Sequence, residues 1–232
     1  MAEFDGQAIL ITGPKGGLGT HVTRMFLAAG ANVAGVSPAI QASDFPDARF
    51  LALPAELSSA DAARAVVEKT MRQFQRLDAL VHLVGAFAGG KPVAETDDAT
   101  FERMLDVNLR TAFYMMRAAI PVMRAAGTGR IIAIGSRAAI EPQPTMAAYS
   151  ASKAALVALV RSVAMENKDR GITANIILPE TMDTPANRAA DPKADFSRWV
   201  NPRQVANLAL WLASAGAAQV SGAAIPVYGA EL

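Results

Sequence analysis

A tyrosine and a lysine four residues apart form the most reactive pattern in the sequence. Tyr149 and Lys153 open a segment with helical periodicity, which places both side chains on one face of the predicted helix, a turn apart. A phenol with its usual pKa near 10 is a poor acid or base at neutral pH. An ammonium about 4 Å away favours the phenolate by roughly 4 kcal/mol, so we expect Lys153 to lower the pKa of Tyr149.

A serine adds a hydrogen-bond donor to this pair. Ser136 closes a predicted strand at 130–135, shortly before Tyr149. A hydroxyl at that place can hold a substrate carbonyl oxygen beside the phenol and polarise it. The plain alternative is an ordinary pair on a surface helix together with a serine that merely ends a strand.

A glycine-rich loop follows the first predicted strand. The segment 12–19 reads TGPKGGLG and runs directly into a helical pattern. Glycines let the backbone turn sharply and approach a pyrophosphate, which the free N–H groups of the following helix then meet. The loop predicts phosphate binding, although a glycine-rich turn with no ligand remains the alternative.

The elements that must position these residues alternate along the chain. Apolar, β-branched runs are each followed by a longer segment with helical spacing, which is typical of a parallel sheet covered by helices. The predicted strands are 8–12, 32–36, 49–53, 79–84, 130–135, 173–178 and 224–227. Predicted helix starts are Ser58 with Asp61, Thr96, and Asn201 with Pro202. We expect one doubly wound α/β domain over residues 1–232, whose ligands bind where strands end.

Composition narrows the class of protein. The 232 residues are 52% hydrophobic and 19% charged with a net charge of +1, which suits a globular domain and gives no basic run for nucleic acid. No apolar run is long enough to cross a membrane, and the N-terminus lacks the pattern of a secretion signal, so we expect a cytoplasmic protein. With no cysteine and two isolated histidines, no metal site is expected.

Taken together, these motifs resemble the short-chain dehydrogenase/reductase family over essentially the whole chain, and the 3-oxoacyl carrier-protein reductases in general layout. The loop 12–19 resembles the family's cofactor loop, and Ser136, Tyr149 and Lys153 fall on its catalytic serine, tyrosine and lysine. Asn108 matches the asparagine that completes the family's tetrad. The resemblance implies a Rossmann-type sheet of seven parallel strands and hydride transfer between a nicotinamide cofactor and a carbonyl or alcohol.

The resemblance also assigns roles to these residues. Tyr149 would be the general acid or base, Ser136 would hold the substrate oxygen, and Lys153 would lower the pKa and bind ribose. Asn108 would hold a water that relays protons to Lys153. The implied cofactor-binding residues are Gly13, Lys15, Gly17, Leu18, Gly19, Ser37, Glu56, Leu57, Gly85, Tyr149, Lys153, Pro179 and Thr184.

Two departures from the family pattern stand at strand ends. Residues 82–85 read HLVG where the family usually has Asn-Asn-Ala-Gly, and His82 either supplies a hydrogen bond or simply packs. Glu180 replaces the usual glycine after Pro179. Its charge either favours a cationic or amine-bearing substrate or points to solvent.

The choice of cofactor depends on the second predicted strand. Sites that prefer NAD normally place an acidic residue near its end, and this chain has Ser37 and Pro38 there instead. Ser37 and Lys15 offer hydrogen bonds and a charge to a phosphate. We therefore expect NADP as the preferred cofactor and keep NAD as possible.

The segment at about 182–200 has no clear periodicity and is expected to be a short lid over the substrate. Helices around Asn108 and after Tyr149 are apolar beyond one stripe, which predicts a homodimer or homotetramer.

The leading hypothesis is an oxidoreductase that transfers hydride between NADP(H) and a small carbonyl or alcohol substrate. One alternative is a pteridine- or imine-type reductase of the same family. The other is a non-catalytic NAD(P)-binding regulator, which would have no need of all four predicted catalytic residues.

Overall fold

Short apolar runs form one parallel sheet in the computed structural model, which describes residues 2–230. The strands are β1 (Ala8–Thr12), β2 (Asn32–Ser37), β3 (Phe50–Pro54), β4 (Ala79–His82), β5 (Gly129–Ile134), β6 (Ile172–Pro179) and β7 (Ala224–Val227). Their order across the sheet is β3-β2-β1-β4-β5-β6-β7, and each neighbouring pair is parallel. The predicted seven-stranded, doubly wound α/β domain is confirmed, with strand bounds that agree to within two residues.

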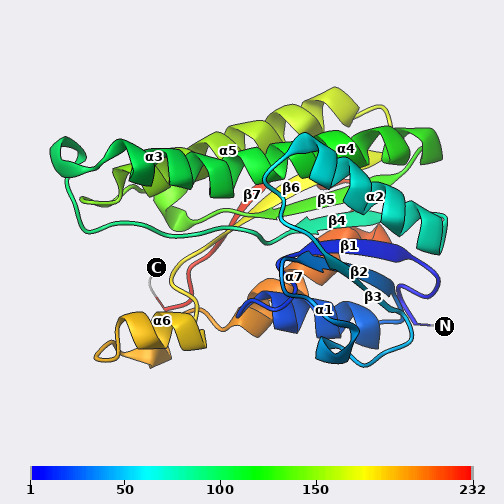
Figure 1. Ribbon diagram of the computed structural model, residues 1–232, viewed down its shortest axis with the longest axis horizontal. Coiled ribbons are helices and arrows are strands. Elements are labelled where there is room, and N and C mark those ends of the chain that lie inside the picture. The colour runs from blue at the N-terminus through cyan, green and yellow to red at the C-terminus, as the bar shows by residue number, and fades with distance from the viewer. Residues whose placement is uncertain (1, 231–232) are drawn as a thin grey trace.

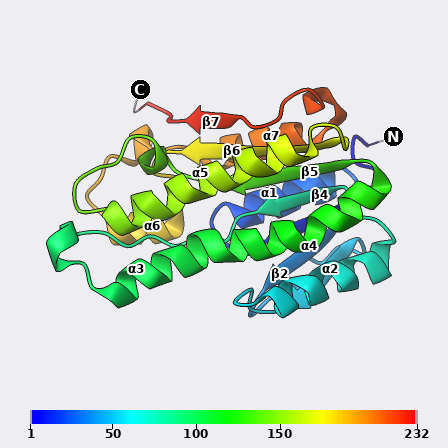
Figure 2. The same cartoon turned by 90° about the horizontal axis from the view of Figure 1, so that it is seen from above.

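Helices cover both faces of this sheet (Figure 1). They are α1 (Gly19–Ala28), α2 (Ala60–Phe74), α3 (Asp98–Leu105), α4 (Thr111–Ala126), α5 (Ala147–Asn167), α6 (Pro185–Ala190) and α7 (Pro202–Ala213). In Figure 1, α2, α4 and α5 lie on one face and α1 and α7 on the other. The view in Figure 2 looks onto the first of these faces, with α6 beyond the end of the sheet.

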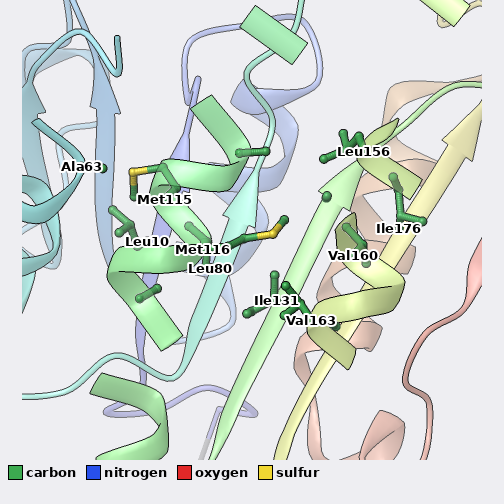
Figure 3. Close-up of a cluster of buried hydrophobic side chains, with 14 of the residues drawn as sticks. Leu10, Ala63, Leu80, Met115, Met116, Ile131, Leu156, Val160, Val163 and Ile176 are labelled. Carbon is green, nitrogen blue, oxygen red and sulfur yellow. The ribbon is translucent and has the colours of Figure 1, made fainter. Parts of the chain in front are cut away.

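Each helix layer buries an apolar face against the strands. On the side of α4 and α5, Leu10, Leu80 and Ile131 of the sheet meet Met116 and Val160 of the helices (Figure 3). All five side chains are fully or almost fully buried. Because both faces of the strands are covered, their runs are apolar throughout rather than alternating, as in β1.

Side-chain caps mark the starts of the three helices whose first residues were predicted from the sequence. Asn201 caps α7 as predicted. The cap of α2 is Ser59 rather than Ser58, and the cap of α3 is Asp97 rather than Thr96. Adjacent residues can both serve as caps, and the backbone register that selects one of them is set by packing of the helix.

One π-helical turn joins α3 to α4. It spans Asp106–Arg110 and contains Asn108, so the helical segment that follows the predicted start at Thr96 consists of two α-helices separated by this turn. The side chains of a π-helical turn point in directions that differ from those of a continuous α-helix. Such turns are frequent at functional sites.

The chain reverses its direction of strand addition between β1 and β4, which is where ligands bind in open sheets of this kind. No helix within residues 2–230 is both long and apolar enough to cross a membrane.

Candidate active site

The glycine loop turns from β1 into α1 at the carboxyl edge of the sheet. Gly13 has a φ of 69°, a conformation that strains other residues. A Cβ atom on Gly19 would collide with the Gly13 carbonyl, and one on Gly17 would lie 2.6 Å from Cγ2 of Thr184. Helix α1 begins at Gly19, its cap residue Leu18 makes no side-chain hydrogen bond, and its first turn has no acidic residue, so this helix end suits an anion although the Thr20 N–H already donates to the Gly16 carbonyl. This cradle fits the pyrophosphate of a dinucleotide.

The predicted serine, tyrosine and lysine converge beside this loop. Tyr149 lies in the first turn of α5, and the Ser136 hydroxyl is hydrogen-bonded to its side chain. Lys153 is buried one turn later, with its Nζ 6.0 Å from the centre of the Tyr149 ring. The Nζ donates to the carbonyl oxygen of Ile134, 3.0 Å away. The end of β5 therefore holds both the serine and the lysine in place.

Asn108 fixes the chain that follows β4. Its Oδ1 accepts from the Ala86 N–H at 2.8 Å, and its Nδ2 donates to the Ala86 carbonyl and to Oγ of Ser152, each at 3.0 Å. A Cβ atom on Gly85 would lie 3.0 Å from Nζ of Lys153 and 3.1 Å from Oδ1 of Asn108. Gly85 thus lies against both functional groups, and a larger residue would push them apart.

The predicted direction of the Tyr149 pKa is wrong. Burial raises the pKa of Tyr149, the hydrogen bond from Ser136 lowers it, and the negative charge of Glu180 raises it. Burial also lowers the pKa of Lys153 from 10.5 to about 8. Since Nζ of Lys153 is directed to a backbone carbonyl, desolvation of the phenol outweighs the attraction that the spacing suggested.

His82 makes hydrogen bonds on both sides of its ring, so it does more than pack. Its Nδ1 lies 3.1 Å from Oγ1 of Thr12 and its Nε2 3.3 Å from Oγ1 of Thr111. The Thr12 hydroxyl accepts from the N–H groups of Leu83 and Val84, so its proton is free for Nδ1. Burial lowers the pKa of His82 to about 3, which leaves the ring neutral and matches one donor and one acceptor nitrogen.

A cavity of about 720 Å³ opens between the ends of β2 and β3 and the helices α3 and α4. It brings together three predicted cofactor-binding residues, Ser37, Glu56 and Leu57. Val84 and Val107 also line it and were not predicted. Their position next to Gly85 and Asn108 in the sequence is the signal that would have found them.

Lys15 is paired with an acidic residue that sequence reasoning left out of the site. Its Nζ lies 2.9 Å from Oδ1 of Asp44 and donates to the Ala39 carbonyl at 3.3 Å. Asp44 belongs to a short 3₁₀ turn, Ala42–Asp44, that follows β2. An acid therefore does lie near the end of the second strand, although no acidic residue stands at the strand end itself.

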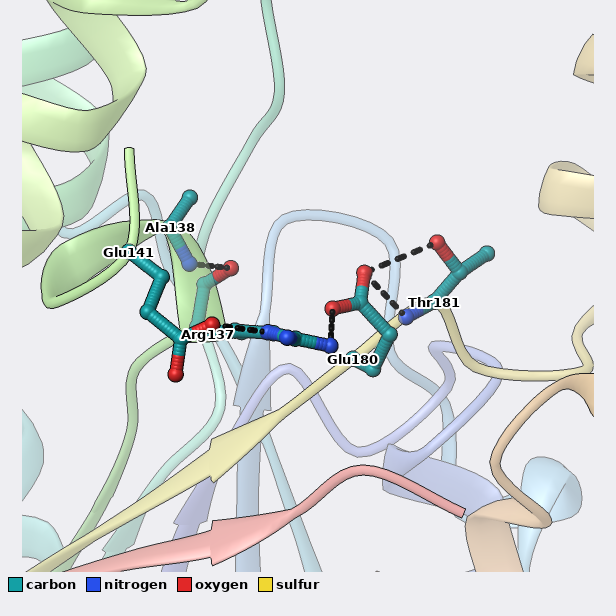
Figure 4. Close-up of polar contacts among 6 residues, drawn as sticks. Arg137, Ala138, Glu141, Glu180 and Thr181 are labelled. Atoms are coloured by element: carbon teal, nitrogen blue, oxygen red, sulfur yellow. Dashed lines mark hydrogen bonds and ion pairs between the residues drawn. The ribbon is translucent and has the colours of Figure 1, made fainter. Parts of the chain in front are cut away.

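Glu180 lies in a charged cluster rather than pointing free into solvent (Figure 4). Its carboxylate is 3.5 Å from Nη1 of Arg137 and accepts from the Thr181 N–H at 3.2 Å. Arg137 also pairs with Glu141 at 2.7 Å and lies over the ring of Tyr228. The cluster connects the segments that follow β5 and β6.

The segment after β6 begins with two predicted cofactor-binding residues. Pro179 ends the strand, and Thr184 is buried against the glycine loop and caps α6. Further along, the rings of Phe196 and Trp199 pack 4.8 Å apart, and Arg188 lies over Phe196. Side chains of this segment are thus packed on one another beyond the ends of β6 and β7.

An exposed aromatic ring stands beside the tyrosine. Phe87 is 60% exposed, and its ring meets that of Tyr149 edge-on with centres 5.1 Å apart. This is an apolar wall next to the reactive hydroxyl, opposite in character to the charged cluster around Glu180.

Comparison with known proteins supplies the family. The sequence profile described as short chain dehydrogenase matches residues 7–195 of this chain. The chain belongs to that family. The 2-dehydro-3-deoxy-D-gluconate 5-dehydrogenase of Pseudoalteromonas atlantica is 30% identical over 245 residues, which cover 98% of this chain and 96% of the relative. The NAD(+)-dependent 2-dehydro-3-deoxy-L-rhamnonate dehydrogenase of a Sphingomonas species is 30% identical over 84% of this chain and 80% of its own.

Solved structures agree with this membership. The crystal structure of 3-ketoacyl-(acyl-carrier-protein) reductase from Brucella melitensis complexed with NADH superposes with a TM-score of 0.89 at 25% identity, covering 98% of this chain and 99% of that one. This short-chain dehydrogenase is therefore an NAD(P)-dependent oxidoreductase with a Rossmann-type fold.

Proposed function

We propose that the protein reduces a carbonyl group of a small molecule with hydride from NAD(P)H, and that Tyr149 supplies the proton. The observation that carries the proposal is the convergence of Ser136, Tyr149, Lys153 and Asn108 beside the glycine loop. A short-chain dehydrogenase with no chemical role would not need these four groups together. The raised pKa of Tyr149 means that the phenol is protonated at neutral pH, which is the form that the reducing direction requires, although it also makes the phenol a weaker acid that needs the nearby charge of Lys153.

The nicotinamide would supply or accept the hydride, and the chain's own residues handle the oxygen and the proton. The Ser136 hydroxyl donates a hydrogen bond to the carbonyl oxygen and holds it beside Tyr149. As the carbon gains a hydride, the Tyr149 hydroxyl gives its proton to that oxygen, which yields the alcohol and a phenolate. The phenolate is then reprotonated from solvent.

Lys153 and Asn108 support this proton transfer. With a pKa of about 8, Lys153 is mostly charged at neutral pH and stabilises the phenolate as it forms. We propose that Lys153 also binds the ribose, and that a water held by Asn108 relays protons to Lys153. The hydrogen bonds from Asn108 to Ala86 support this role because they fix its amide in one orientation.

The proposed cofactor-binding residues lie mainly at the glycine loop and at the cavity between the ends of β2 and β3 and the helices α3 and α4. We propose that Gly13, Gly17, Leu18 and Gly19 receive the pyrophosphate, and that the residues at the cavity, Ser37, Glu56 and Leu57, receive the adenosine end. Gly85, Pro179 and Thr184 would border the nicotinamide end.

NADP(H) is the proposed preferred cofactor, with NAD(H) as the alternative. Ser37 and Lys15 support a 2′-phosphate, whereas the Asp44 carboxylate opposes it by pairing with Lys15. We expect wild type to have the higher kcat/KM with NADPH, and Asp44→Asn to widen that ratio by freeing Lys15. A wild-type preference for NADH that Asp44→Asn leaves unchanged would contradict this choice.

The test of the reaction is consumption of reduced cofactor with a panel of ketones, quinones, acyl thioesters, imines and pterins. Turnover of a carbonyl class supports the proposal. Exclusive turnover of imines or pterins would favour the pteridine- or imine-type reductase, for which the Glu180 carboxylate near Tyr149 is the supporting observation. Tight cofactor binding with every class inert would favour a non-catalytic NAD(P)-binding regulator.

We also propose that residues 182–200 form a short lid over the substrate and that the protein is a homodimer or homotetramer. The exposed apolar side chains of Phe101 on α3, Phe113 on α4 and Met165 on α5 support a further partner for this layer of helices. Sedimentation as a particle of 24.3 kDa, the mass of one chain, would contradict the assembly.

A further inference from the structure

The mechanism above leaves one buried serine of the site unused. Ser152 lies on α5 between Tyr149 and Lys153, and it is fully buried. Its hydroxyl donates to the Tyr149 carbonyl oxygen at 2.7 Å, and its oxygen accepts from Nδ2 of Asn108 at 3.0 Å. Since a hydroxyl has a single proton and Tyr149 takes it, the oxygen is presented to Asn108 as an acceptor. The serine therefore joins the first turn of α5 to the π-helical turn that carries Asn108.

The side-chain amide of Asn108 is held from two elements. The segment after β4 holds it through Ala86, whose N–H donates to Oδ1 and whose carbonyl accepts from Nδ2. Ser152 adds a hydrogen bond from α5, the helix that also carries Lys153. The Sδ atom of Met104, 3.7 Å from Nδ2, is a weak acceptor. Loss of the Ser152 oxygen would therefore leave a buried N–H group of Asn108 poorly paired.

The link between the two helical segments also sets how Asn108 lies relative to Lys153. A Cβ atom on Gly85 would be 3.1 Å from Oδ1 of Asn108 and 3.0 Å from Nζ of Lys153, so both groups flank the same point. Lys153 reaches it from α5 and is held there by the Ile134 carbonyl. Asn108 reaches it from the π-helical turn, so the separation of the two groups depends on how that turn is docked on α5.

We propose that Ser152 is a positioning residue for the proton transfer: by tying Asn108 to the first turn of α5, it keeps the Asn108 amide and the Lys153 ammonium at a fixed separation. It acts through Asn108, because it is fully buried and both of its hydrogen bonds are made to the protein. This inference rests on the proposed function, which gives Asn108 and Lys153 their roles in moving the proton.

The test compares two buried serines in the first turns of α5. Ser152→Ala removes two hydrogen bonds, whereas Ser150→Ala removes a buried hydroxyl that has no hydrogen-bond partner within residues 2–230. We expect Ser152→Ala to lower kcat for carbonyl reduction by roughly 10- to 100-fold, because a small misplacement of a reacting group is costly. The solvent deuterium isotope effect on kcat should rise, because proton transfer then limits the rate.

Two controls belong to this comparison. The cofactor dissociation constant of Ser152→Ala should stay close to that of wild type, which shows that the site is still folded. Ser150→Ala should keep both the wild-type kcat and the wild-type isotope effect. Equal kcat values in the two alanine variants, or a lowered kcat in Ser152→Ala with an unchanged isotope effect, would overturn the inference.

A double-mutant cycle separates positioning from a general loss of stability. Asn108→Ala removes the group that Ser152 holds, so adding Ser152→Ala to it should lower kcat little further. Reductions in kcat that multiply in the double variant would overturn the inference, because Ser152 would then act independently of Asn108.

A further readout does not need turnover. The Ala86 N–H donates to Asn108, so its hydrogen exchange, followed by nuclear magnetic resonance, should be faster in Ser152→Ala and unchanged in Ser150→Ala. Wild-type exchange of Ala86 in Ser152→Ala would show that the serine does not hold Asn108 and would overturn the inference. Retained turnover in Tyr149→Phe would instead refute the proposed function, and the exchange of Ala86 would still decide whether Ser152 positions Asn108.

Discussion

Burial of Lys153 lowers the stability of the fold at neutral pH, and Lys153→Met should reveal by how much. The pKa of Lys153 falls from 10.5 to about 8 because its ammonium is desolvated. The folded state therefore disfavours the charged form, and the unfolded state binds the proton more tightly. As a consequence, the free energy of unfolding rises with pH between about 8 and 10.5. At about pH 7 the difference corresponds to about 3 kcal/mol of lost stability.

Methionine has a similar length and no charge, so the substitution removes this effect. It also deprives the Ile134 carbonyl of its donor, which costs about 1 to 3 kcal/mol but does not depend on pH. The free energy of unfolding of Lys153→Met minus that of wild type should therefore fall by about 2 kcal/mol between about pH 7 and pH 9.5.

Urea unfolding of both proteins at the two pH values measures this difference. Subtracting the wild-type free energy of unfolding from that of Lys153→Met cancels the contribution of every group that titrates alike in the two proteins. A difference that stays constant with pH would show that Lys153 is not held with a lowered pKa, and the reasoning about its burial would fail. Lys153→Met should also lose turnover and bind the cofactor more weakly.

Two further substitutions test the site's framework. His82→Ala removes one hydrogen-bond partner from each of two threonine hydroxyls, Thr12 and Thr111, and should lower the free energy of unfolding by about 1 to 3 kcal/mol. His21→Ala, an exposed control, should change it by less than about 0.5 kcal/mol. Equal effects of the two substitutions would refute the bridging role of His82. Gly17→Ala places a Cβ 2.6 Å from Thr184 and should raise the cofactor dissociation constant, whereas the Cβ of Gly16→Ala meets its nearest atom at 3.4 Å. Equal cofactor affinity in the two alanine variants, measured by calorimetry, would contradict the close docking of Thr184 on the loop.

The sheet was predictable because its strands are buried on both faces and thus appear as continuous apolar runs between glycine- and polar-rich turns. The spacing of Tyr149 and Lys153 also placed them correctly on one helix. Helix starts were less certain, since Ser58 and Ser59 are equally good caps until tertiary packing sets the register.

The sequence alone could not predict ion pairs between residues that are distant in the chain, or how strongly burial desolvates the site residues. Asp44 meets Lys15 only because a 3₁₀ turn folds back after β2, and Glu180 meets Arg137 across two strand ends. The pKa of Tyr149 depends on how deeply the phenol is buried and where the Lys153 ammonium is directed, and neither follows from a four-residue spacing.

The most direct test of the account is steady-state cofactor oxidation by Tyr149→Phe alongside its cofactor dissociation constant. Loss of the hydroxyl should lower kcat by about 10²- to 10⁴-fold, because the carbonyl oxygen loses its proton donor, while cofactor affinity stays close to that of wild type. A variant that turns over its substrate at the wild-type rate would contradict the assignment of Tyr149 as the proton donor.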